Sequence, residues 1–516
     1  MMNIFKIILI YFALLFSINA YSKSNNTKMD YIDIESKYYM GEYTECSNVG
    51  DSIYYVENIY DAMILSYSAL ANHNIAFADR VIDHNDNTYG ANFHRARIKA
   101  QDALEYIISD LNSSKGTKIS DKILPEKLQL YTLAILCSRI LQIPQYKQVV
   151  KYIKDNIIPI RENLGNKFCV EKLQIIYFEI IYALDHDQED YVYKELLPLF
   201  ENEVCSLQSI DPVQKSRIAN IYVQLSDYLN YKLMDTEAAT PQLKDMAINT
   251  MIHSRDYALF SKKANRLAVF IKKDWKQLKS KLTNDEAVLL YFSYARSTDS
   301  WNYIWIIKPG AEEPSLAYGG HSYWSENKEL SLVHELDTLK TIYVVGTNGM
   351  KFTDFYTDSR IVRIHSFSEL SNLKKKYNGG KVTAIGNINY SIDKNSELST
   401  EKGVLRKLGN FASAEREMES LRNIFGDKIE IFQGNNVSRK LLHTLNTKIS
   451  ILHLSTHGMF SKQLLYQYNR DNANLGVTGD NIFKSCGLML SGYNDNKEDN
   501  FISAYDIKNM DLRDID

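Results

Sequence analysis

The stretch Ile449-Ser-Ile-Leu-His-Leu-Ser-Thr-His-Gly-Met-Phe460 decides the fold of the C-terminal part of the chain. Isoleucine and leucine dominate its first half, as in a buried β-strand, and the apolar run ends at Thr456-His457-Gly458. The strand therefore brings a histidine to its carboxyl end, where parallel α/β sheets usually carry their chemistry. Gly458 has no Cβ, so its backbone N–H can come close to a ligand.

Two other interpretations of these histidines compete with a catalytic one. His453 and His457 have the four-residue spacing of the helical zinc motif. On a strand, that spacing separates them by roughly 13 Å at about 3.3 Å per residue, which is too far to share an ion. The glutamate that follows the first histidine in that motif is also absent. We therefore expect no metal site, and the remaining alternative is a pair of histidines satisfied inside a core.

Strands and helices alternate through residues 281–516. The sequence predicts a strand hairpin at 286–294 and 302–307, a helix at 413–425, a strand at 429–432 and a helix at 438–445. Such alternation predicts a parallel sheet with helices on its faces. No glycine loop of the phosphate-binding kind and no Gly-x-Ser-x-Gly elbow is present, so nucleotide and serine-hydrolase chemistry have no support.

Residues 30–280 predict helices instead. Only five of the 22 glycines precede residue 281, and apolar residues recur there at helical spacing, as in Leu128–Cys137 and Leu173–Ile181. Prolines stand where helices would begin or end. Helical hairpins in series predict a solenoid of the tetratricopeptide (TPR) kind, although the Trp and Leu-Gly positions of that repeat are absent. An irregular helical bundle is the alternative.

Residues 1–20 have the pattern of a signal peptide. Lys6 precedes the apolar core Ile7–Phe16, and Ser17-Ile-Asn-Ala20 offers a small residue for cleavage. We expect export to the periplasm or the extracellular space, with no stable membrane span after cleavage because the apolar core is short. The five cysteines allow one or two disulfides in such a compartment, but their spacing does not pair them.

Composition narrows the possible partners. The 516 residues predict two to four domains, with 45% hydrophobic and 24% charged residues, as in a globular protein. A net charge of −3 gives no electrostatic support for nucleic-acid binding. Acidic loops at 83–87 and 494–500 vaguely suggest calcium, but solvated loops explain them better, because the first lacks the necessary glycine and the second lies in a connecting segment. We expect no cofactor.

Several motifs in the second half resemble those of the CHAT domain, a caspase-like domain of the cysteine peptidase clan that contains caspases, separases and gingipains. The resemblance covers roughly residues 280–516, with Asn500 in place of the usual glycine. Its motifs are Lys340–Val345 with Gly349 and Phe355, Lys381–Gly386 with Tyr390, Leu452–Gly458, Ser485–Asn494, Asp499–Ile507 and Met510–Leu512.

The resemblance implies a caspase-like fold, with His457 as the general base that activates a cysteine. A backbone N–H, one plausible donor being that of Gly458, would hold the oxyanion. In such peptidases the cysteine follows a strand that would come a few residues beyond Asp516, so we expect this chain to be truncated and catalytically incompetent as given. Cys486 aligns with the family's connector, and we interpret it as a small buried residue.

Two functional hypotheses follow. The first is an exported CHAT-type cysteine endopeptidase acting on protein or peptide substrates, with His457 as its base. The second is a binding protein in which TPR-like helices carry an inactive peptidase-like domain that recognises partner proteins. The expected domains are a signal peptide at 1–20, a helical repeat at 30–280 and an incomplete CHAT domain at 281–516.

Overall fold

The chain divides into two compact units in this computed structural model. The first contains Met1–Phe367 with Ala473–Gly476, and the second contains Ser368–Asn472 with Val477–Asp516. The predicted signal peptide and the loops at 83–85 and 494–499 lie outside the described residues. The structure describes residues 30–35, 37, 38, 42–82, 86–113, 124–165, 168–207, 212–236, 239–259, 274–296, 299–321, 336, 338–345, 360–364, 370, 380–391, 413–445, 449–461, 464, 483–493 and 500–510.

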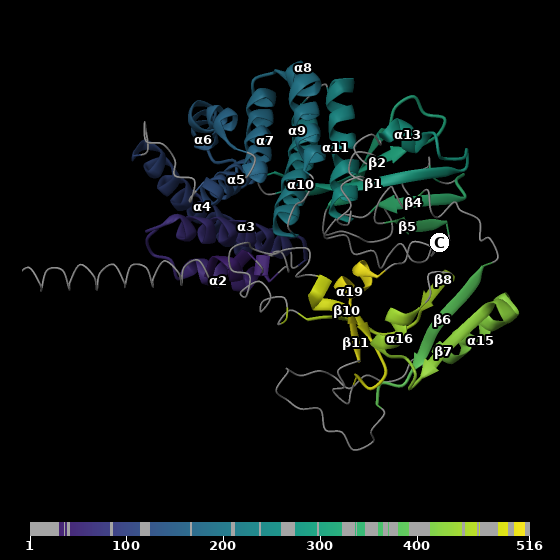
Figure 1. Cartoon of the computed structure of the whole chain (residues 1–516). Coiled ribbons are helices and arrows are strands. Elements are labelled where there is room, and N and C mark those ends of the chain that lie inside the picture. Colours follow the sequence, from purple (N-terminus) through teal and green to yellow (C-terminus); the bar gives the residue numbers. More distant parts are fainter. Residues whose placement is uncertain are drawn as a thin grey trace, which may run out of the picture. The chain divides into compact units, whose positions relative to one another are not determined.

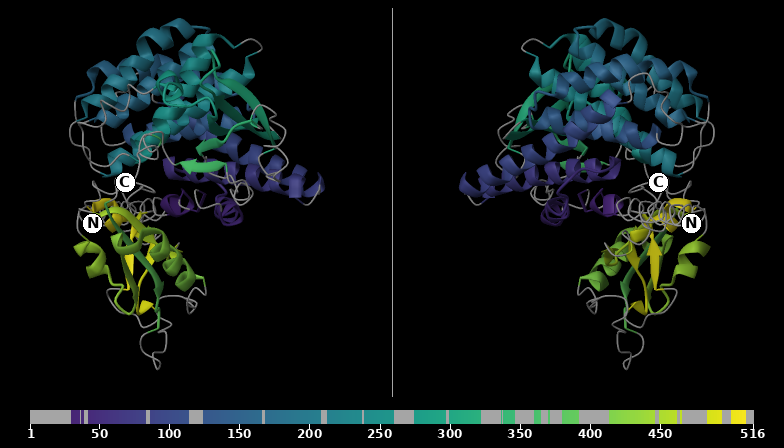
Figure 2. Two further views of the ribbon diagram at one scale, coloured as in Figure 1. Left: turned by 90° about the vertical axis from the view of Figure 1, so that its right-hand side faces the viewer. Right: turned by 90° about the vertical axis from the view of Figure 1, so that its left-hand side faces the viewer.

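Helices form most of the described part of the first unit up to residue 279, which confirms the predicted helical region (Figure 1). Successive helices lie side by side in both further views, where they are coloured purple to teal (Figure 2). Among the described residues, no helix is both long and apolar enough to cross a membrane. The helices are α2 (Tyr43–Asp51), α3 (Ile59–Ile82), α4 (Asp86–Ser113), α5 (Leu124–Ile140), α6 (Tyr146–Tyr152), η1 (Ile153–Ile157), η2 (Ile158–Asn163), α7 (Cys169–Asp185), α8 (Glu189–Tyr191), η4 (Val192–Leu196), α9 (Leu197–Ser206), α10 (Pro212–Asp235), α11 (Pro241–Leu259) and α13 (Trp275–Lys279).

Two consecutive helical hairpins turn in the same way. At the turn after α5, Gln142 has a φ of 53°, and at the turn after α7, Asp187 has a φ of 57°. In each turn the following N–H bonds back to a carbonyl of the finished helix, Ile143 to Ser138 and Gln188 to Ala183. The last carbonyls of a helix have no hydrogen-bond partner within the helix. A residue in the left-handed region turns the chain so that the next N–H can donate to one of these carbonyls.

The return helices of these hairpins also share a feature. A five-residue π-helical turn, η1 or η4, comes just before Pro159 or Pro198. The N–H of Ile158 donates to the Ile153 carbonyl, and that of Leu197 donates to the Val192 carbonyl. Ahead of each proline, the hydrogen bonds therefore span five residues instead of the four of an α-helix. Because proline has no N–H and crowds the preceding turn, this shift lets the chain continue as a helix.

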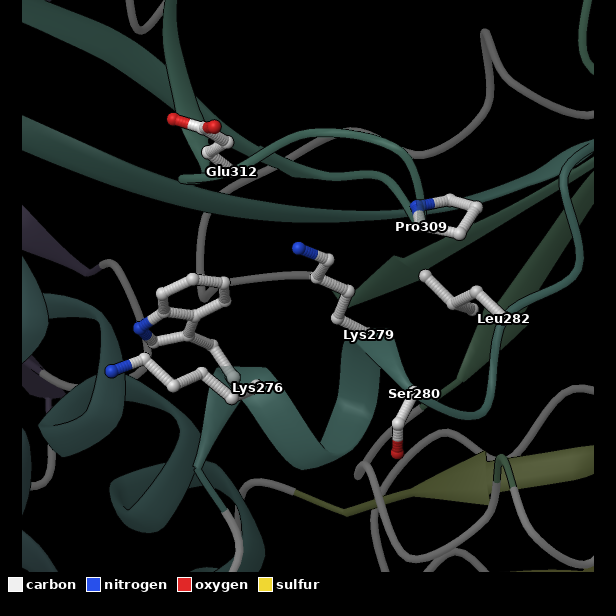
Figure 3. A pocket seen from close by; sticks show the side chains of 7 residues that line it. Lys276, Lys279, Ser280, Leu282, Pro309 and Glu312 are labelled. Carbon is white, nitrogen blue, oxygen red and sulfur yellow. The ribbon is translucent and has the colours of Figure 1, made fainter.

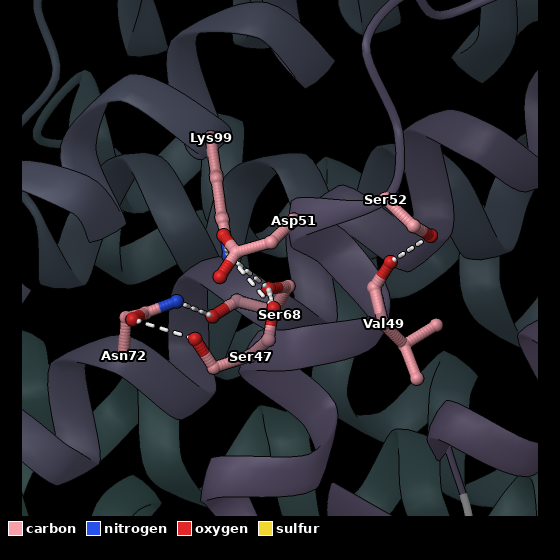
Figure 4. A network of polar contacts seen from close by, with 7 residues as sticks. All are labelled: Ser47, Val49, Asp51, Ser52, Ser68, Asn72 and Lys99. Carbon is pink, nitrogen blue, oxygen red and sulfur yellow. Dashed lines mark hydrogen bonds and ion pairs between the residues drawn. The ribbon is translucent and has the colours of Figure 1, made fainter.

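A buried lysine joins helices α2, α3 and α4 of this unit. The Lys99 ammonium donates to the Ser68 hydroxyl at 2.8 Å and the Ser47 carbonyl at 3.0 Å, and pairs with Asp51 at 2.6 Å (Figure 4). Burial lowers the pKa of Lys99 despite the carboxylate beside it. A Cβ at Gly50 would lie 2.2 Å from the Ser68 oxygen, so only glycine lets α2 approach α3 here.

A five-stranded mixed sheet completes the first unit, in the order β3-β2-β1-β4-β5. β1 and β2 are the predicted hairpin, with Leu290 opposite Trp305, while β1, β4 and β5 are parallel to one another. The strands are β1 (Glu286–Arg296), β2 (Asp299–Ile307), β3 (Ser315–His321), β4 (Thr341–Val345) and β5 (Ile361–Ile364).

This sheet packs against the helices. Both α5 and α10 contact β1, and the indole N–H of buried Trp305 donates to the Asn230 side chain of α10 at 3.4 Å. The helix-to-strand change falls between α13 and β1, near the predicted boundary at 280. The sheet nevertheless shares a compact unit with the helices. The predicted domain limits stay a prediction.

The described residues of the second unit include two small sheets and the helices α15, α16 and α19. One sheet is parallel with the order β7-β6-β8, and the other is antiparallel with the order β11-β10-β9. The predicted helices and strands between 413 and 454 are confirmed. The elements are β6 (Lys381–Ile388), α15 (Ala414–Phe425), η9 (Gly426–Lys428), β7 (Ile429–Gly434), α16 (Arg439–Thr444), β8 (Ile449–Leu454), β9 (Gly458–Phe460), β10 (Cys486–Met489), β11 (Phe501–Ser503) and α19 (Ala504–Asn509).

Candidate active site

His457 lies just beyond the carboxyl end of β8. The strand is parallel to β6, with Leu454 opposite Ile385, and the Ser455 N–H extends the pairing by bonding to the Ile385 carbonyl at 2.7 Å. His457 is half-buried, and Gly458 beside it is exposed and begins β9. The two predicted site residues are therefore placed at a strand end that solvent reaches.

Tyr390 holds the backbone of this histidine. Its hydroxyl accepts the His457 N–H at 3.2 Å and lies 3.0 Å from the Thr456 hydroxyl, which in turn bonds to the Met489 carbonyl. The Tyr390 ring and the imidazole are 5.0 Å apart and tilted by 51°. Tyr390 belongs to the buried hydrophobic core of the second unit, so it links His457 to that core.

The N–H of Gly458 points away from the neighbouring strand β10. Hydrogen-bonded pairs alternate with non-bonded pairs along an antiparallel ladder. Met489 donates to the His457 carbonyl and Ser461 donates to the Ser485 carbonyl, which places the intervening pair of Gly458 and Leu488 at a non-bonded position. Since β9 ends the described strand order, the Gly458 N–H faces an edge that no described strand covers, where it can donate to a ligand.

A second polar network lies on the opposite face of β8. The Glu417 carboxylate of α15 lies 3.1 Å from His453 Nε2 and accepts the Ser455 hydroxyl at 2.6 Å. A Cβ at Gly386 would lie 2.7 Å from the Met418 side chain, so glycine on β6 lets α15 pack closely. The sequence analysis missed Glu417. Side chains alternate between the two faces of β8, so His453 and Ser455 lie on one face and Leu452, Leu454 and Thr456 on the other. Two polar side chains on one face were the sequence signal for a polar partner there.

Cys486 does not have the properties of a nucleophile. It lies on β10 opposite Phe460, two positions along the ladder from the pair formed by Gly458 and Leu488. Its Sγ bonds weakly to the Phe483 carbonyl at 3.9 Å, and burial raises the pKa of its thiol. A raised pKa reduces the thiolate fraction that a nucleophile needs.

The other cysteines belong to the first unit, and none of the five, all of which the structure describes, forms a disulfide. Burial raises the pKa of Cys46 and of Cys137 to about 12, so these thiols stay protonated at neutral pH. No group of three or more metal-binding side chains occurs among the described residues.

A surface cavity of about 430 Å³ lies in the first unit, and its lining contains no histidine or cysteine (Figure 3). Lys279 extends into its centre, with Leu282 and Pro309 on one side. The Lys279 ammonium is already engaged by the Ala311 carbonyl and lies 5.9 Å from the Trp275 ring. The one hydroxyl of its lining, that of Ser280, donates to the Gln277 carbonyl at 2.8 Å, so the candidate active site is the end of β8.

One comparison with known proteins finds a family match over the part of the chain that contains this strand end. A search of curated proteins finds no match. Residues 349–516 match the CHAT domain family, which covers the described elements of the second unit and β5. The chain therefore carries a CHAT domain over these residues, which suggests a domain related to the caspase-like peptidases.

Proposed function

We propose that the CHAT domain supplies the histidine half of a caspase-like cysteine endopeptidase site, with His457 as the general base. The observation that carries this proposal is the position of His457 at a solvent-accessible strand end. Its backbone N–H is held there by the Tyr390 hydroxyl. A fixed imidazole can take the proton of a thiol and later give it to the leaving amine of a peptide. The outward-facing N–H of Gly458 would stabilise the oxyanion formed in between.

The nucleophile of this site is a cysteine other than Cys486. Cys486 is the one cysteine in the sequence of the second unit, and its pKa is raised where a nucleophile needs a lowered one. We propose that the thiol comes from a strand that pairs beyond β8, the last strand in the order β7-β6-β8. Parallel pairing at that edge would put the carboxyl end of the added strand beside His457.

An activity-based probe tests this proposal. An acyloxymethyl ketone, which alkylates activated cysteines, is applied to the protein purified from its source cells. We expect labelling that disappears in His457→Ala and persists in Cys486→Ala. Labelling that disappears in Cys486→Ala would overturn the assignment of the nucleophile. A protein that no such probe labels would overturn the peptidase function itself.

A binding protein is the second candidate, because the second unit holds no activated thiol of its own. In that case the helices would act as a TPR-like scaffold for a partner protein. Two consecutive hairpins support such a repeat, since they share a left-handed turn residue and a π-helical turn before proline. A saturable protein partner, captured equally well by native protein and His457→Ala, would favour this candidate.

We also propose that the protein is exported. The support is the signal-like pattern of residues 1–20, with Lys6 ahead of an apolar core. Mass spectrometry of the purified protein tests this point, because cleavage after Ala20 would give a chain that begins at Tyr21. An intact Met1 in the purified protein would contradict export by this route.

A further inference from the structure

The surface cavity of the first unit lies between helix α13, the segment before β1 and the loop that joins β2 to β3 (Figure 3). Its volume of about 430 Å³ is in the range of small-molecule sites. It lies outside the matched CHAT region, so the proposed peptidase chemistry does not use it. Charged and apolar side chains share its lining, which consists of Trp275, Lys276, Lys279, Ser280, Leu282, Pro309 and Glu312.

Hydrogen bonds hold the walls of this cavity in place. Trp275 is 4% exposed, and its indole N–H donates to the Asp245 carboxylate at 2.8 Å. Its backbone N–H donates to the Asn249 side chain at 3.0 Å. The Lys279 ammonium donates to the Ala311 carbonyl, which ties α13 to the loop between β2 and β3. A site that is already held in shape loses little conformational freedom when a ligand binds.

Two opposite charges in the lining are available to a ligand. An ammonium group has three hydrogens, and the Ala311 carbonyl takes one of those of Lys279, so two remain. Glu312 is exposed and forms no hydrogen bond or ion pair within the described part of the chain. The other charged residue is Lys276, which pairs with Asp245 at 3.6 Å and points in a different direction from Lys279 (Figure 3). The cavity therefore offers one ammonium and one carboxylate.

An apolar wall lies beside the Lys279 side chain. Leu282 and Pro309 lie together on one side of it (Figure 3). Leu282 is only 8% exposed, so this wall is part of the packed fold. An apolar group of a ligand that packs on the wall would lose contact with water, which favours binding.

The lining specifies a ligand with three parts. A carboxylate would pair with Lys279, an ammonium would pair with Glu312, and an apolar side chain would pack on Leu282. A phosphate group does not fit, because Glu312 would repel it, and an internal stretch of a peptide supplies neither charge. We propose that the cavity binds an apolar zwitterion, either a free amino acid such as leucine or a dipeptide of apolar residues. Charge-assisted hydrogen bonds at both ends would fix its orientation.

Calorimetric titration of the 516-residue protein with L-leucine tests the proposal. We expect saturable binding that weakens by about 10-fold in Glu312→Gln, because this variant keeps the shape of the side chain and loses its charge. Glu313→Gln is the matched control, since Glu313 is the next residue, is also exposed and is not part of the lining. Equal affinities of the two variants for L-leucine would overturn the proposal.

Two blocked forms of leucine separate the contributions of its charges. N-Acetyl-L-leucine lacks the ammonium and L-leucinamide lacks the carboxylate, so native protein should bind each about 10-fold more weakly than L-leucine. Glu312→Gln should remove the first difference, and Lys279→Met should remove the second. Circular dichroism verifies that Lys279→Met is folded, because this variant also loses the bond to Ala311. Blocked forms that bind native protein as tightly as L-leucine would overturn the assignment of the charges.

L-Leucyl-L-leucine distinguishes the two sources of the zwitterion, because its charges lie farther apart than those of L-leucine. Tighter binding of either compound supports the site and identifies its ligand. Glycine has both charges but no side chain, so it should bind more weakly than L-leucine, and equal binding would overturn the role of the apolar wall. If neither L-leucine nor the dipeptide gives a saturable signal, the proposal fails.

Discussion

The hydroxyl of Tyr390 accepts the backbone N–H of His457 at 3.2 Å, and the two rings lie 5.0 Å apart. A side chain of the core thus replaces the ladder bond that His457 would make if β8 continued. This relationship explains how the chain can leave the sheet at Thr456 while the histidine stays in a fixed position. It also gives the proposed general base a support whose removal can be tested.

Tyr390→Phe should loosen His457 while the core keeps its ring. The variant loses the acceptor for the His457 N–H and the contact with the Thr456 hydroxyl, which should cost about 1 kcal/mol of unfolding free energy. The amide signal of His457 in an NMR spectrum should shift strongly. Tyr493→Phe is the control, because its hydroxyl bonds to Met459. A His457 signal that moves equally in both variants would contradict the support role.

Glu417→Ala should weaken the attachment of α15 to β8. The carboxylate serves both His453 and Ser455, but its side chain is 41% exposed, so solvent screening keeps the expected loss to about 0.5–1 kcal/mol. Glu419→Ala, on an exposed position of the same helix, controls for helix propensity. Urea unfolding of the two variants provides the measurement. The network has no structural role if both lose the same stability.

The local elements near the candidate site could be predicted from the sequence. Apolar runs with β-branched residues predict β7 and β8, and the spacing of Met418, Leu421 and Phe425 predicts α15, because these signals depend on neighbours in the chain. The Thr-His-Gly end of β8 also marked the site. Glu417 could not be assigned from its own surroundings, because its partners lie 36 and 38 residues away.

The packing of the five-stranded sheet against the helices could not be predicted from local sequence patterns either, because the residues in contact lie far apart in the chain. Trp305 and Asn230 are 75 residues apart, and nothing local shows that this strand meets α10. The paired hairpins did leave a readable trace, since Pro159 and Pro198 each begin a Pro-x-x-Glu-Asn segment. Comparing the helical region with itself at this spacing would have paired these two segments before the structure was known.

Gly487→Ala should destabilise the antiparallel sheet that carries Gly458. A Cβ at Gly487 would lie 2.1 Å from the Ile502 carbonyl oxygen and 2.7 Å from Ser503 Cα, and neither backbone atom can move freely. We expect a loss of about 1–3 kcal/mol in unfolding free energy. At Gly458 the one described atom that an added Cβ would meet is the Gly487 oxygen, at 3.9 Å, so Gly458→Ala should unfold at nearly the native urea concentration. Equal midpoints for the two variants would contradict the crowding.

Lys99→Met should destabilise the start of the helical region. The variant keeps a similar apolar stem but leaves the Ser68 hydroxyl and the Ser47 carbonyl without their donor, which should cost about 1–3 kcal/mol. Lys151→Met, at an exposed position of α6, is the matched control and should cost little. The midpoint of thermal unfolding, followed by circular dichroism, separates the two. A control that loses as much stability would show that the network does not stabilise the fold.

Tyr177 should make the protein lose stability in alkaline solution. Burial raises the pKa of this 3% exposed side chain to about 12, above the value near 10 of an unfolded tyrosine. Between these values the folded protein binds more protons than the unfolded chain. Its contribution is therefore complete below pH 10 and is lost as pH rises toward 12. For this one group, the loss between pH 9 and pH 11 is about 1 kcal/mol.

Tyr177→Phe removes the ionisable hydroxyl, so its unfolding free energy should fall by about 1 kcal/mol less than that of native protein over the same interval. Other buried tyrosines contribute equally to both proteins and cancel in this difference. Tyr193→Phe, at a 40% exposed position, is the control and should follow the native curve. Guanidinium unfolding at pH 9, 10 and 11 measures all three proteins. A Tyr177→Phe curve parallel to the native one would show that this hydroxyl ionises in the folded protein as easily as in the unfolded chain.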